Sequence, residues 1–275
     1  MRKILYIKNK IKKIFGRKKS NPFRGSPLVK EPQETKQKYI DIWEDAKRKD
    51  YPIINHYEIE SGFFIKKEWL DSLALHTQIV IKKSKICYQH GRILYSTLRQ
   101  YIKNNNILNI NIVEIGTARG FSSVCMAKGL EDSNIKGKII TIDPLPHNYK
   151  IYWNCIDDWD GKKTRKKILF NYKNLIKKYI IFIEGKSKDE LSKIYFKRIH
   201  FAFIDGEHDY ENVVREFQFV SSRQLLGDII IIDDYTIELF PEIVRAVDYL
   251  CKKYNYIKRV ILLSNERGYV IAIKN

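Results

Sequence analysis

Acidic side chains directly follow two short apolar runs in the C-terminal half of the sequence. Asp205 follows one run, and Asp233 and Asp234 follow the other. On neighbouring strands these carboxylates would repel one another and raise one another's pKa values. A divalent cation with oxygen ligands, such as Mg²⁺, removes that cost; the simpler alternative is that one or two of the acids only cap helices. His208 stands close by and could take a proton from a hydroxyl group, or it could merely pack at the start of a helix.

A glycine-containing segment follows an earlier apolar run. It places Glu114, Gly116 and Gly120 in the pattern ExGxxxG, with Thr117 inside it. Glycines allow a sharp turn and the close approach of a ligand, although an ordinary strand–helix turn would use them too. The dinucleotide fingerprint GxGxxG is absent, because Gly116 has no glycine two residues before or after it.

Further polar residues stand at the ends of two other runs. Asp143 could accept hydrogen bonds from both hydroxyls of a ribose, or it could cap a turn. Ser187 lies in a small loop that could border a purine ring. Behind the glycine segment we expect a helix that is capped by Ser122 or Ser123.

The runs that precede these residues are short, rich in Ile, Val and Phe, and nearly continuous, as strands buried on both faces of a parallel sheet are. They are Ile110–Ile115, Lys138–Ile142, Tyr179–Ile183, His200–Ile204 and Asp228–Ile232. Segments with helical periodicity, Ser122–Leu130 and Glu211–Leu225 among them, separate the runs. The sequence therefore predicts an α/β fold with a doubly wound, mostly parallel sheet, whose ligands bind at the carboxyl ends of the strands.

The two ends of the chain differ from this alternating region. Tyr256–Leu263 and Tyr269–Ile273, joined by a turn at Asn265–Gly268, read as a C-terminal antiparallel hairpin. We divide the chain into a basic amphipathic extension (1–35), a helical region (36–105) and a core (106–275). Ile86–Ile102 repeats apolar residues at helical spacing, and we expect the helical region to cover the site and shape the acceptor pocket.

The ordered set of motifs resembles the class I S-adenosylmethionine-dependent methyltransferases. The resemblance rests on Glu114–Gly120, Asp143, Phe203–Tyr210 and Gly227–Tyr235. Within that class the motifs are most similar to the catechol-type and macrolide-sugar-type O-methyltransferases. The likeness extends from about residue 88 to the C-terminal hairpin, which is the usual last element of this Rossmann-like fold; residues 1–85 carry none.

The resemblance implies S-adenosylmethionine as the cofactor. It assigns six residues to the cofactor site: Glu114, Gly116, Thr117, Gly120, Asp143 and Ser187. Within this set the two glycines would face the methionine part, the glutamate would order their loop, the aspartate would bind the ribose and the serine would lie near the adenine.

The same resemblance implies a catalytic centre at the other acids. Asp205, Asp233 and Asp234 match the metal-ligand positions of the catechol-type enzymes, where the last position is often Asn, so Mg²⁺ is the expected ion. His208 stands where those enzymes carry a lysine base. Sugar-modifying relatives use an acid near this position, which leaves His208 and Asp205 as the two candidate catalytic residues.

Composition limits the other function classes. The formal net charge is +19, but residues 1–30 contain eleven Lys and Arg and no acid, so the other 245 residues carry only +8. We therefore do not expect a nucleic-acid partner. A nucleic-acid methyltransferase remains an alternative because Lys162–Lys178 is basic, although the Asn/Asp-Pro-Pro-Tyr/Phe signature is absent. A non-catalytic protein with the same fold is a second alternative, and an NAD-dependent oxidoreductase a weaker third.

The spacing of the cysteines and the length of the apolar runs predict a cytoplasmic protein. The four cysteines are scattered without a CxxC pair, and no run approaches the roughly 18 apolar residues of a membrane span.

The N-terminal segment has the pattern of an amphipathic helix. A basic helix over residues 3–19 would carry one apolar stripe, formed by Ile4, Ile7, Ile11, Ile14 and Phe15. Such a helix could hold residues 1–20 at an anionic membrane surface, as would suit a lipid-linked glycan acceptor; a basic arm and a docked helix are the alternatives. We otherwise expect a small-molecule acceptor.

Overall fold

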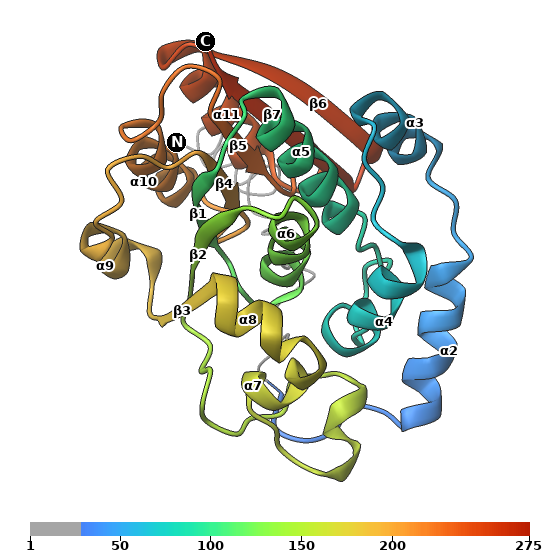
Figure 1. The fold of residues 1–275 in the computed structure, drawn as a ribbon. Helices are drawn as coiled ribbons and strands as arrows, with labels where there is room; N and C mark the ends of the chain where they lie inside the picture. The colour runs from blue at the N-terminus through green and yellow to red at the C-terminus, as the bar shows by residue number, and fades with distance from the viewer. Residues whose placement is uncertain (1–28) are drawn as a thin grey trace, which may run out of the picture.

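The computed structural model describes residues 29–275, so the predicted amphipathic helix over residues 3–19 lies outside the described residues. Seven strands form one sheet in the order β3-β2-β1-β4-β5-β7-β6 (Figure 1). The strands are β1 (Asn109–Ile115), β2 (Lys136–Asp143), β3 (Ile180–Glu184), β4 (Phe201–Ile204), β5 (Ile229–Ile232), β6 (Tyr256–Ser264) and β7 (Arg267–Lys274). β1 to β5 are parallel, whereas β7 runs antiparallel to both β5 and β6. The predicted doubly wound sheet and its terminal hairpin are confirmed.

Helices cover both faces of the sheet because the strands alternate their side chains between two apolar clusters. Phe203 and Ile231 belong to one cluster, while Ala202 and Ile230, their neighbours along the strands, belong to the other. Helices α5, α6 and α8 contribute to the first cluster, and α10 and α11 to the second. The helices of the core are α6 (Phe121–Asp132), α7 (Arg165–Ile168), α8 (Lys173–Tyr179), α9 (Ser187–Glu190), α10 (Tyr210–Ser221) and α11 (Pro241–Lys253).

The region before the sheet is helical, as its periodicity predicted. It contains α2 (Lys36–Lys47), α3 (Pro52–Ser61), α4 (Lys67–Thr77) and α5 (His90–Asn104). Buried side chains from all four helices share the apolar cluster of α6 and α8. Helix α5 is strongly amphipathic and packs along α6, so it belongs to the layer that covers the sheet (Figure 1). Within residues 29–275, none of the helices is both long and apolar enough to span a membrane.

The terminal hairpin differs from the prediction in its turn. We expected the turn at Asn265–Gly268, but β6 ends at Ser264 and β7 begins at Arg267, which leaves a turn of two residues. A register shift between Leu262 and Ser264 marks an irregularity in β6 that accommodates the tighter connection. The consequence is that Arg267 belongs to a strand, where its position relative to β5 is fixed.

Candidate active site

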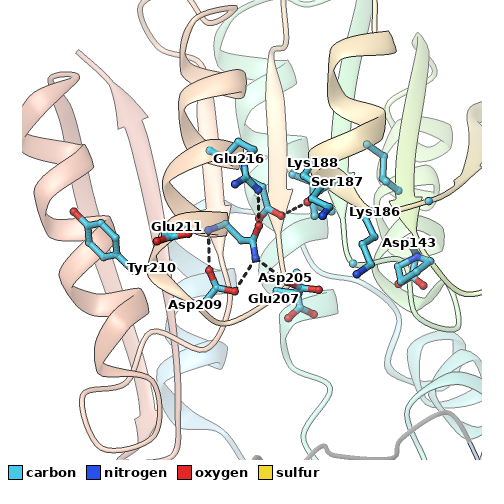
Figure 2. A pocket seen from close by; sticks show the side chains of 18 of the residues that line it. Asp143, Lys186, Ser187, Lys188, Asp205, Glu207, Asp209, Tyr210, Glu211 and Glu216 are labelled. Carbon is cyan, nitrogen blue, oxygen red and sulfur yellow. Dashed lines mark hydrogen bonds between the residues drawn. The ribbon is translucent and has the colours of Figure 1, made fainter.

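The carboxyl ends of the parallel strands border a cleft of about 730 Å³ (Figure 2). It opens where the strand order reverses between β1 and β4, which is where open α/β sheets bind their ligands. Four of the predicted site residues line it: Gly116, Asp143, Ser187 and Asp205. The cleft therefore joins the predicted cofactor loop to one of the predicted catalytic acids.

Gly116 brings the end of β1 against the end of β4. Its φ is +96°, and a Cβ at this position would lie 2.6 Å from the carbonyl carbon of Asp205, closer than real Cβ atoms approach. Only glycine fits both requirements. Gly120, with φ of +94°, is the N-cap of α6. Thr117 is buried and its hydroxyl bonds to that of Thr141, so Thr117 and Gly120 shape the loop without lining the cleft.

Glu114 lies under this loop and is completely buried. The Ser123 hydroxyl donates a hydrogen bond to its carboxylate, and burial raises the pKa of Glu114. The expected cap by Ser122 or Ser123 is wrong: Gly120 starts the helix without a side-chain cap. The physical reason is that Ser123 faces inward and pairs with Glu114 instead of with the free backbone N–H groups of the first turn.

Asp143 ends β2 and is held by the loop that follows β1. Its two carboxylate oxygens accept hydrogen bonds from the backbone N–H groups of Ala118 (2.8 Å) and Leu145 (2.7 Å). The buried guanidinium of Arg165 lies 3.6 Å from Asp143 and donates to the carbonyl oxygens of the same two residues. Burial nevertheless raises the pKa of Asp143. Each carboxylate oxygen keeps a second lone pair, so the side chain can still accept a ligand hydroxyl.

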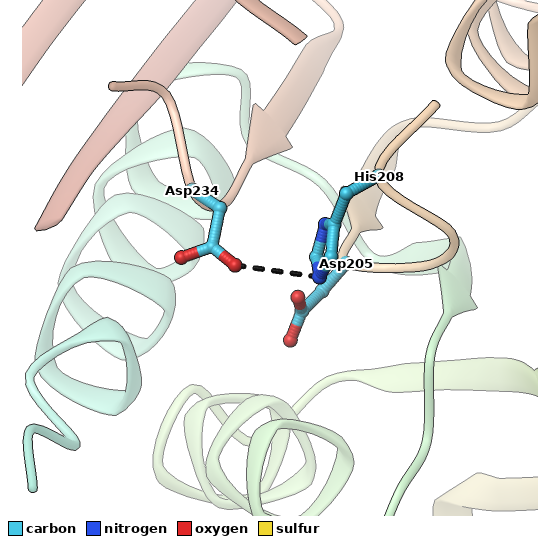
Figure 3. Close-up of side chains that lie close together, drawn as sticks. All are labelled: Asp205, His208 and Asp234. Atoms are coloured by element: carbon cyan, nitrogen blue, oxygen red, sulfur yellow. Dashed lines mark ion pairs between the residues drawn. The ribbon is translucent and has the colours of Figure 1, made fainter. Parts of the chain in front are cut away.

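The catalytic candidates assemble beside the cleft (Figure 3). One ligand atom from each of Asp205, His208 and Asp234 lies within 4.8 Å of the other two. Nε2 of His208 is 3.5 Å from Oδ2 of Asp234, and the His208 ring lies against Phe240 with ring centroids 4.6 Å apart. Burial and the charges of Asp233 and Asp234 raise the pKa of Asp205 well above its usual range. Two carboxylates and one imidazole thus face a common point.

Asp233 lines the same small cavity but is not one of the three residues whose ligand atoms lie close together. Its Oδ1 accepts hydrogen bonds from the backbone N–H of Asp234 (2.7 Å) and from Nη1 of Arg267 (3.2 Å). Arg267 also donates to Asp234 at 2.8 Å. Asp234 has φ of +56°, an uncommon backbone conformation for a residue with a side chain, and such strain gathers at functional sites.

Sequence reasoning did not identify Arg267, which it placed in a turn. The pairing of β7 with β5 would have identified it, because this pairing sets Val270 opposite Ile232. The residues just before Val270 must then lie beside those that follow Ile232, which include Asp233 and Asp234. Sequence reasoning also did not assign Lys82, His90 and Arg119 to the site, although all three line a cavity beside these acids.

Three cavities follow one another across this end of the sheet. Asp205 borders both the cleft and a smaller cavity of about 150 Å³, which His208, Asp233 and Asp234 also line. Arg267 in turn borders that cavity and a third one of about 900 Å³ between the α2–α3 connection and the terminal hairpin. The acid cluster therefore lies between two larger spaces.

Burial changes the pKa values of two basic side chains that line the smaller cavity. Its lining includes Lys82, whose pKa burial lowers to about 8, and His90, whose pKa burial lowers to about 4. His90 is therefore neutral at pH 7, while His208 is the histidine placed against a carboxylate.

Comparison with known proteins agrees with this geometry. Residues 113–235 match the model of a family described as a methyltransferase domain. The O-methyltransferase NovP shares 17% identity and a TM-score of 0.53 over 70% of this chain and 82% of that chain. The O-methyltransferase TomG from Streptomyces achromogenes is involved in tomaymycin synthesis and was solved in complex with SAM. It shares 14% sequence identity with this chain, with a TM-score of 0.55 over 79% of this chain and 94% of that chain.

A third solved structure, an O-methyltransferase from Bacillus cereus in complex with SAH, shares 16% identity and a TM-score of 0.51 over 84% of this chain and 94% of that one. At these identities the likeness concerns the fold. No curated protein sequence matches the chain.

Residues 113–235 therefore match a methyltransferase domain, and the sheet has the fold of the O-methyltransferases named above, as the sequence predicted. The matched segment includes both the glycine loop of β1 and the acids that follow β4 and β5.

Proposed function

We propose that this protein transfers a methyl group from S-adenosylmethionine to a hydroxyl oxygen. The observation that carries the proposal is the position of Asp205, which borders both the cleft at the switch point and the cavity that holds His208 and Asp234. A cofactor in the cleft and an acceptor beyond Asp205 would meet at the acid cluster. Gly116, Asp143 and Ser187 would hold the cofactor in the cleft.

Bound S-adenosylmethionine supplies an electrophilic methyl group: the acceptor oxygen forms the new O–CH₃ bond as the S–CH₃ bond breaks, which leaves S-adenosylhomocysteine. The protein must hold the reacting atoms in line, which is mainly a matter of positioning. His208 takes the hydroxyl proton on its ring. Asp234, 3.5 Å from Nε2 of His208, then stabilises the imidazolium that results. Asp205 borders the reaction point and is the second candidate for the base.

The third cavity supports a hydroxyl-rich acceptor such as a sugar. Its lining combines the aromatic ring of Tyr51 and the apolar side chains of Ile86, Leu239 and Leu263 with polar and charged side chains: Lys49, Asp50, Lys85, Glu238, Asn265, Glu266 and Arg267. The polar groups can hydrogen-bond to the hydroxyls of a sugar, and the aromatic and apolar side chains can pack against the face of its ring. We propose that the acceptor is a sugar, free or within a glycan, and that a phenolic metabolite is the alternative outcome of the test.

We propose, as the alternative to His208 acting as the base, that Asp205, His208 and Asp234 hold a divalent cation that assists the reaction, because an imidazole bound to a cation has no lone pair left to take a proton. Their ligand atoms are close enough to share one ion, and the imidazole among them suits Mn²⁺ or Zn²⁺ better than the Mg²⁺ expected from carboxylates alone. Such an ion, when bound, would lower the pKa of the acceptor hydroxyl. Asp234→Asn should abolish Mn²⁺ binding in calorimetry. Asp233→Asn should retain it, because Asp233 is not one of the three residues whose ligand atoms lie within 4.8 Å of one another. Full activity in excess chelator would exclude metal assistance.

Methyl transfer itself is tested with isotope-labelled S-adenosylmethionine and an extract of hydroxylated metabolites and glycans. We expect a product heavier by one methyl group, labelled when the wild-type chain is present and strongly reduced with His208→Ala. Cofactor binding without any transfer would favour the non-catalytic alternative, and label in RNA or DNA would favour the nucleic-acid alternative.

We propose finally that residues 1–20 hold the enzyme at an anionic membrane surface, where lipid-linked glycans are built. Support comes from the sequence pattern: eight Lys and Arg of residues 3–19 surround the apolar stripe, and each contributes about 1 kcal/mol near an anionic leaflet. The full chain should sediment with anionic vesicles at low salt, and a chain that starts at Lys30 should not. Equal sedimentation of both chains would contradict this assignment.

A further inference from the structure

Glu216 is a buried carboxyl group that the proposed mechanism does not use. It lies on α10 and is only 1% exposed, yet it lines the cleft beside Ser187 (Figure 2). The Ser187 hydroxyl donates a hydrogen bond of 2.6 Å to Oε1 of Glu216. Oε2 has no hydrogen-bond partner among the described residues. Leaving a buried carboxylate oxygen without a hydrogen-bond partner costs free energy. This oxygen therefore indicates a ligand that donates a hydrogen bond to it.

Gly206 lies directly against the carboxylate of Glu216. It follows Asp205, and a Cβ on Gly206 would lie 3.1 and 3.3 Å from the two carboxylate oxygens of Glu216. A side chain at residue 206 would therefore crowd the carboxylate. Both residues line the cleft, together with Ser187.

The charges around Glu216 define what that ligand must offer. Burial, Asp209 and Glu207 raise the pKa of Glu216 to about 7, while the Ser187 hydrogen bond and Arg215 on the same helix lower it. The group is thus close to balanced between its two protonation states at neutral pH. A ligand that donates a hydrogen bond favours the ionised state, and an N–H donor of a planar base meets this need.

We propose that Glu216 recognises the adenine of the cofactor by accepting a hydrogen bond from its exocyclic amino group, with Ser187 orienting the carboxylate. This inference rests on the proposed function, since it requires S-adenosylmethionine in the cleft. It makes Glu216 a specificity-determining residue that discriminates adenine from a base in which the amino group is replaced by oxygen.

The experiment is calorimetric titration with S-adenosylhomocysteine and with its deaminated analogue, S-inosylhomocysteine. The wild-type chain should bind the amino compound about 10–100-fold more tightly, the range of one hydrogen bond to a charged group. Glu216→Gln should reduce that preference to about 3-fold or less, because an amide can turn to pair with either substituent. Glu68→Gln, an identical change at an exposed position of α4, should keep the full preference.

A second readout measures the protons that are released on binding. At pH 7 the wild-type chain should release protons as S-adenosylhomocysteine binds, measured in two buffers of different ionisation enthalpy, and Glu216→Gln should release fewer. Tight binding of both compounds without preference, or binding without proton release, overturns the role of Glu216 and leaves the proposed function standing. Failure of the wild-type chain to bind S-adenosylhomocysteine at all overturns both.

Discussion

Replacing Gly116 with alanine tests whether the cofactor loop and the catalytic strand end depend on one close backbone contact. Both Gly116 (φ +96°) and Gly62 (φ +74°) adopt a left-handed conformation, which costs an alanine about 1–2 kcal/mol. An added Cβ at Gly62 meets nothing within 4 Å, whereas at Gly116 it would overlap the backbone carbonyl of Asp205. Overpacking of this kind adds about 1–3 kcal/mol. We expect Gly116→Ala to lose about 2–5 kcal/mol and Gly62→Ala about 1–2 kcal/mol.

Urea unfolding measures both losses, and calorimetry with S-adenosylhomocysteine adds a functional readout. Gly116→Ala must displace the end of β1 or of β4, and both ends border the cleft, so its affinity should fall about 10-fold or more. Gly62→Ala, at the C-terminal end of α3, should bind as the wild type does. Equal destabilisation by the two substitutions, or unchanged affinity in Gly116→Ala, would refute the reasoning.

Three further outcomes follow from single contacts. His208→Ala should lower turnover by about 10²–10⁴-fold, the usual contribution of a general base, with little change in S-adenosylhomocysteine affinity; unchanged turnover across the pH range would leave His208 a packing residue. The raised pKa of Glu216, about 7 against a usual 4.5, means that the folded state binds more protons than the unfolded state between these values. Wild-type stability should therefore fall from pH 5 to pH 7.5 by up to about 3 kcal/mol relative to Glu216→Gln in urea unfolding, and parallel pH profiles would contradict this. Asp228→Asn should cost about 3 kcal/mol at pH 7, since buried Asp228 accepts hydrogen bonds from Tyr101 and Arg198, and a urea midpoint within error of the wild type would exclude that.

Much of the fold could be predicted because the sheet follows from composition along the chain. Continuous apolar runs identify strands buried on both faces, and the predicted run Ile110–Ile115 differs from β1 by one residue. The acids at the strand ends could be placed near one another by topology alone, since parallel strands end at one edge of the sheet.

The remaining parts depend on contacts between distant segments, which no local pattern encodes. Arg267 reads as a turn residue until the pairing of β7 with β5 is known, and its pairing with Asp233 and Asp234 then follows. Glu216 reads as one polar position of an amphipathic helix, and only the packing of α10 beside Ser187 shows that it is buried.

The central claim is that the cleft at the carboxyl ends of β1, β2 and β4 binds S-adenosylmethionine. Calorimetric titration of the full chain with S-adenosylmethionine, S-adenosylhomocysteine and NAD tests it most directly, with Asp143→Ala as the matched variant and a thermal melt to confirm that the variant folds. We predict one site per chain for both sulfur compounds, no binding of NAD, and a loss of about 1–3 kcal/mol of binding free energy in Asp143→Ala, as expected for lost hydrogen bonds to a charged group. Tight binding of NAD with no binding of either sulfur compound would contradict the account.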